Sequence, residues 1–268
     1  MDCVAIIPAR YGSTRFPGKP LATLEGTPLI CHVATRCAQV EGLDRVVVAT
    51  DDERIAEAAR DCGVEAVMTS PDFASGTDRI AHVAADLGAD IVLNVQGDEP
   101  LINPEALSGA LREFRAGSHE LGTLRAPLTD SAQLWDPHCV KLVVDRDGTA
   151  LYFSRAPIPY SRDSVQSSTV GPGGKGALEF IAEPPQQGAC WIHVGVYMYR
   201  TPALQRWARM PRSQLEIVED LEQLRVLEAG ERIQTFEVAE AFPGIDTPAD
   251  LERVRRALTE PKSQDYKP

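Results

Sequence analysis

The sequence predicts an α/β protein built on a parallel sheet, and its apolar patterning and composition support this prediction. Short apolar runs alternate with amphipathic helical patterns from residue 4 to residue 100. The 268 residues are 43% hydrophobic, which is enough for one large domain or two small ones. Strands and helices that alternate in this way are joined by right-handed crossovers, and ligands bind at the carboxyl ends of such strands.

Four apolar runs in the first part of the chain predict buried strands, and the segments between them predict helices. The strands are expected at residues 4–7, 45–50, 64–69 and the start of 90–100. The helices are expected at residues 28–41, 52–62 and 76–88. Asp51 and Asp52 open the second helix, where carboxylates favour the helix dipole. The loops after residues 8, 50, 69 and 95 should therefore converge on one cleft.

The pattern changes beyond about residue 120. The runs LGTLRAPL, VKLVVD and ALYFSR lie close together without clear helices between them, which predicts an inserted antiparallel or mixed segment. Residues 161–188 predict a mobile loop rather than a phosphate cradle, because no strand immediately precedes the run GPGGKG. A strand at 191–199, a helix at 213–229, a strand at 233–238 and a last helix capped by Thr247 follow.

The chain is acidic, with 39 Asp and Glu against 27 Lys and Arg and a net charge of −12. This balance argues against a nucleic-acid partner, and a polyphosphate ligand would need a local basic pocket and a divalent cation. Six cysteines are scattered without a CxxC pair or a Cys/His cluster, which indicates free thiols in a reducing compartment. No secretory pattern and no apolar run of about 20 residues is seen, so a cytoplasmic protein with no membrane partner is expected.

A basic loop follows the first predicted strand. Arg10, Arg15 and Lys19 lie close together in the stretch AIIPARYGSTRFPGKP, with Ser13 between them. Glycines let the backbone approach a ligand and cations neutralise phosphate oxygens, so this loop suits a polyphosphate. It is not a Walker loop, because Pro20 stands where Ser or Thr would bind magnesium. The alternative is a solvated basic turn.

Two carboxylates are candidates for a magnesium site. Asp98, in VQGDEP, stands at the carboxyl end of a predicted strand and supplies the oxygen ligands that Mg²⁺ prefers. Asp246, in PGIDTP, is the natural second ligand. Two such acids that meet at the cleft would match magnesium-dependent phosphoryl or nucleotidyl transfer. The alternatives are a turn in which Asp98 accepts backbone amides and a capping role for Asp246.

Several other polar residues have both a functional and a structural interpretation. In ASGTDR, Ser75 and Gly76 resemble a helix entry that attracts anions, with Arg79 one turn further on. The alternative there is a plain helix cap and a solvated cation. The remaining candidates could equally be a structural strand histidine, a surface ion pair and the solvated face of a helix: His193, Arg155, Glu216 and Gln223.

Nine runs of the sequence together resemble one family, the CMP-KDO synthetases or 3-deoxy-D-manno-octulosonate (KDO) cytidylyltransferases. They occur in this order and cover nearly the whole chain: IPARYGSTRFPGKPL, VVVATDDERI, SGTDRIA, LNVQGDEP, VKLVVD, ALYFSRAPIPY, HVGVYMYR, LEQLRVLEAGERI and DTPADLERV. Each run alone is shared with other sugar nucleotidyltransferases, whereas the set is highly specific. Residues 161–188 depart from the usual pattern, because they look longer and richer in Gly and Pro.

The resemblance implies a mostly parallel, Rossmann-like nucleotidyltransferase sheet with helices on both faces and a mixed-strand dimerisation insert. It implies one domain over 1–268, with 120–200 as a dimerisation subdomain of a homodimer. The implied reaction is Mg²⁺-dependent transfer of CMP from CTP to the anomeric hydroxyl of KDO, which releases pyrophosphate and activates the sugar for lipopolysaccharide synthesis. The alternatives are a cytidylyltransferase for another acidic sugar, such as a sialic acid or 8-amino-KDO, and a non-catalytic nucleotide or sugar sensor.

The resemblance also implies a role for each candidate residue. The nucleotide side would be formed by Arg10, Ser13, Arg15, Lys19, Thr50, Asp51, Ser75 and Gly76. The sugar side would be formed by Arg79, Gln96, Arg155, His193, Glu216 and Gln223. The catalytic residues would be Arg10 and Lys19, which stabilise charge on the phosphates, and Asp98 and Asp246, which carry Mg²⁺. No side chain is expected to act as a general base.

Overall fold

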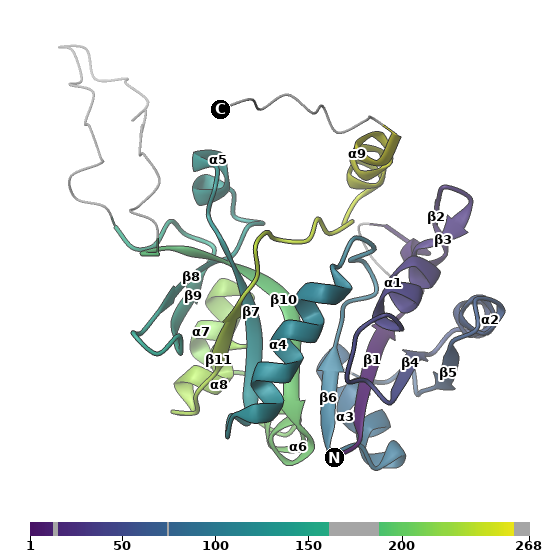
Figure 1. Cartoon of the computed structure of the whole chain (residues 1–268), viewed down its shortest axis with the longest axis horizontal. Helices are drawn as coiled ribbons and strands as arrows, with labels where there is room; N and C mark the ends of the chain where they lie inside the picture. The colour runs from purple at the N-terminus through teal and green to yellow at the C-terminus, as the bar shows by residue number, and fades with distance from the viewer. Residues whose placement is uncertain (13–15, 74, 161–187, 260–268) are drawn as a thin grey trace. The chain divides into compact units, whose positions relative to one another are not determined.

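The structure is a computed structural model that describes residues 1–12, 16–73, 75–160 and 188–259 (Figure 1). Ser13, Arg15 and the loop expected at 161–188, except for its last residue, therefore lie outside the described residues. The chain forms two compact units, and it passes from the second to the first within one strand, β10. The first unit comprises Met1–Arg115, Val196–Ala208 and Phe242–Pro268, and the second comprises Ala116–Gly195 and Arg209–Ala241.

The first unit is built on a sheet with the strand order β10-β6-β1-β4-β5. The strands β6, β1, β4 and β5 run parallel, and the end of β10 pairs antiparallel with β6. The predicted parallel sheet is therefore confirmed. Its strands are β1 (Cys3–Ala9), β4 (Arg45–Thr50), β5 (Glu65–Met68), β6 (Ile91–Asn94) and β10 (Trp191–Arg200).

Helices cover both faces of this sheet because the direction of the chain reverses. The path steps outward from β1 through β4 to β5, and it then returns to β6 on the other side of β1. Right-handed crossovers place the first two helices on one face and the third on the opposite face. The three predicted helices are confirmed, and each is shorter than its predicted range. They are α1 (Leu29–Cys37), α2 (Glu53–Asp61) and α3 (Gly76–Leu87).

Two further helices of the first unit, α4 (Pro104–Ala116) and α6 (Thr201–Ala208), were not predicted. The signal was present for α4, because Leu107, Leu111 and Phe114 recur at helical spacing and are buried. The last helix, α9 (Pro248–Thr259), begins as predicted.

The second unit has mixed strand pairing, as predicted. β7 (Leu121–Pro127) and β11 (Gln234–Glu237) are parallel, whereas β8 (Lys141–Val144) pairs antiparallel with β9 (Ala150–Ser154) and with the start of β10. Its helices are α5 (Ser131–Trp135), α7 (Gln214–Glu219) and α8 (Leu224–Glu228).

The single helix expected at 213–229 is wrong, because the chain forms α7 and α8 instead. Asp220 ends α7 in the left-handed conformation, with φ 51°. The guanidinium of Arg155 donates to the carbonyl oxygens of Glu219 and Asp220, at 2.7 and 3.1 Å. These carbonyls are thereby satisfied without a continuing helix.

No helix among the described residues is long and apolar enough to cross a membrane. All six cysteines are free thiols.

Candidate active site

A pocket of about 570 Å³ lies within the first unit, at the carboxyl ends of its parallel strands. The loops after residues 8, 69 and 95 contribute to it, which confirms most of the predicted convergence. The loop after residue 50 is not among the lining residues. The pocket is lined by Pro8, Ala9, Arg10, Lys19, Pro20, Phe73, Ser75, Gly76, Arg79, Gln96, Gly97, Asp98 and Asp246.

Lys19 lies between two carboxylates in this pocket. It begins the short 3₁₀ helix η1 (Lys19–Leu21), which Gly18 precedes in a left-handed conformation with φ 72°. The ammonium Nζ of Lys19 lies 2.5 Å from Oδ2 of Asp98 and 3.2 Å from Oδ1 of Asp246. One side-chain cation therefore joins two acids that are far apart in the sequence.

The position of Asp246 is set by the segment around it. The amide of Ile245 donates to the carbonyl of Asp98 at 2.9 Å, so the two acidic segments are joined through the backbone. Thr247 caps α9, because its Oγ1 accepts the amide of Asp250 and the Asp250 carboxylate accepts the amides of residues 246 and 247. Asp246 itself is therefore not the cap of this helix.

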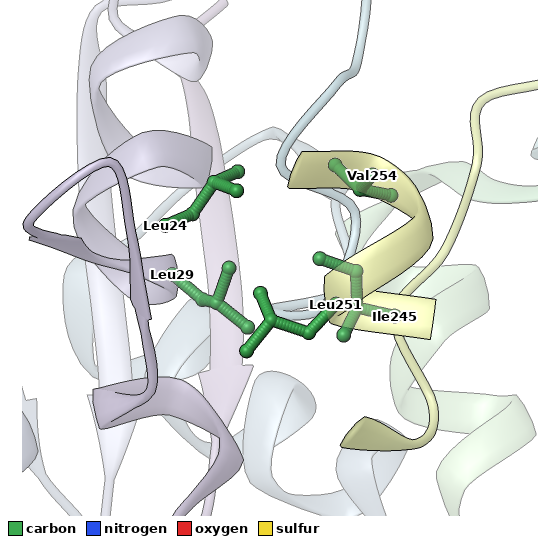
Figure 2. Close-up of a cluster of buried hydrophobic side chains, with 5 residues drawn as sticks. All are labelled: Leu24, Leu29, Ile245, Leu251 and Val254. Atoms are coloured by element: carbon green, nitrogen blue, oxygen red, sulfur yellow. The ribbon is translucent and has the colours of Figure 1, made fainter. Parts of the chain in front are cut away.

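A hydrophobic cluster packs the start of α9 against the N-terminal part of the first unit (Figure 2). Leu24, at the end of β2 (Thr23–Leu24), and Leu29, at the start of α1, face Ile245, Leu251 and Val254. All five side chains are buried, which removes apolar surface from water and stabilises this arrangement. The cluster thus helps to hold Asp246 beside Lys19.

The paired carboxylates fit a divalent cation such as Mg²⁺. Magnesium prefers oxygen ligands, and proteins usually supply it with one or two carboxylates while a substrate phosphate completes the shell. The ammonium between Asp98 and Asp246 marks a place where a positive charge is stabilised. No group of three or more His, Cys, Asp or Glu that could hold a metal ion occurs in the described part of the chain.

Gly97 lets the loop after β6 approach the end of β1 closely. A Cβ at this position would lie 3.1 Å from the carbonyl oxygen of Pro8 and 3.6 Å from Cδ1 of Ile30. Across the pocket, Ser75 caps α3 and exchanges hydrogen bonds with Asp78. The helix begins at Gly76, so its first amides lie at the pocket wall, where they attract anions.

Arg79 is buried rather than solvated. Its guanidinium donates to Oγ1 of Thr69 and to Oδ2 of Asp51, the latter at 2.9 Å. Arg79 therefore ties α3 to the loops after β4 and β5 while it lines the pocket. Thr50 is fully buried, and its hydroxyl accepts the amide of Asp52. Sequence reasoning missed these contacts because the partners of Arg79 are distant in the sequence.

The second unit holds the other candidate residues, and two of them make extensive internal contacts. Arg155 donates to backbone carbonyls, including that of Pro137, so it is not a surface ion pair. Glu216 is 3% exposed and pairs with Arg225 at 2.6 and 2.7 Å, so it is not on a solvated face. Burial alone would raise the pKa of Glu216, but hydrogen bonds from Arg225 and the Ser213 amide hold it below its usual value.

Gln223 and His193 are also buried to a large extent. Gln223 is 4% exposed, and its Nε2 has no hydrogen-bond partner among the described residues. His193 lies on β10 with its Nε2 2.9 Å from Oγ1 of Thr123, and burial lowers its pKa to about 4. Thr123 was not predicted, because only the pairing of distant strands reveals it.

A sequence profile of the cytidylyltransferase family matches residues 4–233. A fold with this parallel sheet and this pocket, together with that match, defines a nucleotidyltransferase. A 3-deoxy-manno-octulosonate cytidylyltransferase from Geobacter sulfurreducens is 45% identical over 96% of this chain and 100% of its own length. A protein of the same name from Anaeromyxobacter is 47% identical over 94% of this chain and 95% of its own length. The chain belongs to the 3-deoxy-manno-octulosonate cytidylyltransferase family.

Solved structures agree with this assignment. A CMP:2-keto-3-deoxy-manno-octonic acid synthetase complexed with CTP is 42% identical, with a TM-score of 0.84, and the match covers 96% of this chain and 98% of that one. A cytidylyltransferase from Leptospira borgpetersenii has a TM-score of 0.62 at 16% identity, covering 100% of this chain and 90% of that one, which shows the shared fold alone.

Proposed function

We propose that this chain transfers CMP from CTP to the anomeric hydroxyl of KDO, giving CMP-KDO and pyrophosphate and so activating the sugar for lipopolysaccharide synthesis. The observation that carries the proposal is the contact of Lys19 with both Asp98 and Asp246 in the pocket of a KDO cytidylyltransferase fold. The anomeric oxygen forms a bond to the α-phosphorus of CTP. The bond from that phosphorus to the β-phosphate oxygen breaks, and the hydroxyl proton passes to solvent.

The nucleotide side of the site uses the basic loop and the start of α3. Arg10 and Lys19, with Ser13 and Arg15, hold the triphosphate, while Ser75 and Gly76 border the nucleotide. Thr50 and Asp51, which do not line the pocket, contribute indirectly, because Asp51 accepts a hydrogen bond from the pocket residue Arg79 and Thr50 accepts the amide of Asp52. The chain carries a net charge of −12, so attraction of a triphosphate depends on such a local group of cations. Positioning and charge neutralisation account for most of the rate enhancement, because phosphoryl transfer needs little covalent chemistry from the protein.

Asp98 and Asp246 would hold Mg²⁺ in this proposal. A bound Mg²⁺ neutralises charge on phosphate oxygens and lowers the pKa of a hydroxyl that it contacts. The ammonium of Lys19 is then available to the phosphates instead of the carboxylates. Lys19 and Arg10 together stabilise the negative charge that develops on the transferring and leaving phosphates.

The residues proposed to recognise the sugar are described within each unit separately. Arg79 and Gln96 line the pocket, and Gln223 has a buried amide nitrogen that a ligand oxygen would satisfy. His193, which is neutral at physiological pH, contributes a hydrogen bond to the sugar. Arg155 and Glu216 act mainly by holding α7 and its neighbours in place, because their polar atoms already have partners.

Assembly and location complete the proposal. The chain acts as one domain, and its residues 120–200 form the interface of a homodimer. Sedimentation equilibrium would test whether the protein is a dimer. The location is cytoplasmic, in keeping with six free thiols, and neither a nucleic acid nor a membrane takes part.

The deciding experiment is a pyrophosphate-release assay with purified protein, CTP and Mg²⁺, run over a panel of KDO, 8-amino-KDO and a sialic acid. Rapid pyrophosphate release with KDO, and with neither of the other two sugar acids, supports the proposal. Preference for another acid would show a cytidylyltransferase with a different sugar substrate. Binding of CTP without pyrophosphate release for any sugar would show a sensor and would refute the proposal. Asp98→Ala is the control for contaminating enzymes.

A further inference from the structure

The two ends of the basic loop are joined to each other at Tyr11 and Gly18. The amide of Gly18 donates to the carbonyl oxygen of Tyr11 at 3.0 Å. Gly18 is left-handed, with φ 72°, and a Cβ there would lie 3.1 Å from the Tyr11 ring, so glycine suits both the backbone conformation and the close approach. Arg10 directly precedes Tyr11, and Lys19 directly follows Gly18. The contact therefore sets the spacing of the two loop cations that line the pocket.

A guanidinium from the first turn of α2 lies over the face of the Tyr11 ring. The guanidinium carbon of Arg54 is 3.7 Å from the ring centroid, which is a close cation–π contact. Arg54 is itself held in place, because its Nε and Nη2 donate to the two carboxylate oxygens of Asp52 at 2.9 and 2.6 Å. Such a two-point pair fixes the plane of the guanidinium as well as its position.

Asp52 connects this contact to the framework of the first unit. Its Oδ1 accepts the backbone amide of Arg54, so the carboxylate caps α2 while it pairs with the side chain. The amide of Asp52 in turn donates to the hydroxyl of the fully buried Thr50, at the end of β4. A continuous set of contacts therefore runs from the buried sheet through Asp52 and Arg54 to the ring of Tyr11.

We propose that Tyr11 and Arg54 are positioning residues that hold Arg10 and Lys19 where the triphosphate of CTP binds. The inference rests on the proposed function, because it takes the basic loop to hold the triphosphate. Neither Tyr11 nor Arg54 is among the residues that line the pocket, so they act behind the two cations and not on the ligand. A loop that is already held in its binding conformation loses less entropy when the ligand binds, and its affinity is higher for that reason.

The charge of Arg54 does not account for the same effect. Asp52 neutralises the guanidinium in the two-point pair, and the arginine side chain is 57% exposed to solvent, where salt and water screen charges strongly. A positive charge in that setting adds little attraction for a triphosphate. What Arg54 supplies is a flat face that packs on the ring of Tyr11, and a lysine ammonium has no such face.

The direct test compares the binding of CTP and of CMP without sugar, measured by isothermal titration calorimetry in the presence of Mg²⁺. Tyr11→Leu removes the aromatic face and should weaken CTP binding about tenfold, the size of one lost cation–π contact together with the lost ring packing. CMP carries one phosphate instead of three, so its affinity should stay within about a factor of two. Tyr11→Phe keeps the ring and should restore the original affinity for CTP.

Variants of Arg54 separate packing from charge. Arg54→Met removes the guanidinium and should weaken CTP binding about three- to fivefold, because an exposed cation–π contact is a weak one. Arg54→Lys keeps the charge but neither the plane nor the two-point pair with Asp52, so it should bind CTP as weakly as Arg54→Met does. The matched control is Arg60→Met, which removes a similarly exposed arginine of the same helix, paired with Glu53 at 2.7 Å, and should leave CTP binding unchanged.

The outcomes separate this inference from the proposed function. Unchanged CTP affinity in Tyr11→Leu, or equal losses for CTP and CMP, would overturn the positioning role. Full CTP affinity in Arg54→Lys would show that the charge at residue 54 acts on the phosphates, and it would overturn the role of the packed guanidinium. An unmodified chain that binds no CTP would refute both ideas. The proposed reaction is otherwise decided by pyrophosphate release with CTP and KDO, which these binding measurements do not include.

Discussion

Lys19 and Asp98 form a close ion pair in the pocket, with Nζ of the lysine 2.5 Å from Oδ2 of the aspartate. Asp246 lies on the other side of the same ammonium, at 3.2 Å. The lysine is mostly buried, so the pairing is less screened than on an open surface. The chain thus supplies its own cation where two neighbouring carboxylates would otherwise repel each other.

The first prediction concerns Lys19→Met. Removing the ammonium leaves two uncompensated carboxylates, so affinity for Mn²⁺ without nucleotide should rise about tenfold. Turnover should fall about 100- to 1,000-fold, because a charged group that stabilises the transition state is lost. Electron paramagnetic resonance of free Mn²⁺ measures the affinity. Arg45→Met, which removes an equal charge from an exposed ion pair with Glu65, should change neither quantity. Unchanged or weaker Mn²⁺ binding in Lys19→Met would contradict the idea that the Lys19 ammonium competes with a metal ion for the two carboxylates.

The second prediction concerns the close approach at Gly97. Gly97→Ala places a methyl group 3.1 Å from the carbonyl oxygen of Pro8. Pro8 belongs to β1, a strand that is paired on both sides. Stability should fall by about 1–3 kcal/mol, and turnover should fall because Asp98 shifts. Urea unfolding and pyrophosphate release measure the two effects. Gly109→Ala, within α4 and with open space around it, should raise stability by about 0.5–1 kcal/mol and leave turnover unchanged. The account fails here if both glycine variants behave alike.

The third prediction concerns the hydrophobic cluster that holds the start of α9. Leu251→Ala should cost about 2–3 kcal/mol of stability and also lower kcat, because Asp246 loses support from the packing beneath it. Leu111→Ala, in the buried face of α4, should cost a similar amount of stability without lowering kcat. Chemical unfolding and activity at saturating substrate give the comparison. Equal kcat values for the two variants would show that the cluster does not position Asp246.

The fourth prediction concerns the pH dependence of stability. His193 has a pKa of about 4 in the folded chain and about 6.5 when unfolded. Between these values the unfolded chain binds a proton that the folded chain does not, so stability falls as pH falls through this window. From roughly pH 7 to pH 5 the loss should be about 2 kcal/mol. His193→Gln should lack this part of the pH dependence, while His82→Gln, at an exposed histidine, should retain it. Parallel pH curves for the native chain and His193→Gln would be inconsistent with a buried neutral ring.

Local sequence signals were sufficient for most of the first unit. The apolar runs that became β1, β4, β5 and β6, and the caps at Asp52, Ser75 and Thr247, depend on residues within a few positions of one another. Convergence of the loops followed from the rule that ligands sit at the carboxyl ends of parallel strands. The meeting of Lys19 and Asp98 could therefore be predicted, whereas Asp246 lies outside these loops and its sequence context left a capping role equally open.

Features that depend on distant partners could not be predicted in this way. The break at Asp220 arises because Arg155, 65 residues earlier, donates to the carbonyl there. The apolar pattern alone favoured one long helix, although Val218 within it is 81% exposed. The partners of Arg79 and Glu216 were likewise hidden, because a charged residue in a helix is usually solvated and nothing local shows that it is buried.

A double-mutant cycle on Asp98 and Asp246 tests the central claim most directly, because two ligands of one cation should not act independently. Pyrophosphate release under single-turnover conditions would be measured for Asp98→Asn, Asp246→Asn and the double variant. Each single change should slow the reaction about a thousandfold, and the double variant should be little slower than either one. Losses that multiply in the double variant, or a single variant that retains nearly normal turnover, would contradict a shared cation at this site.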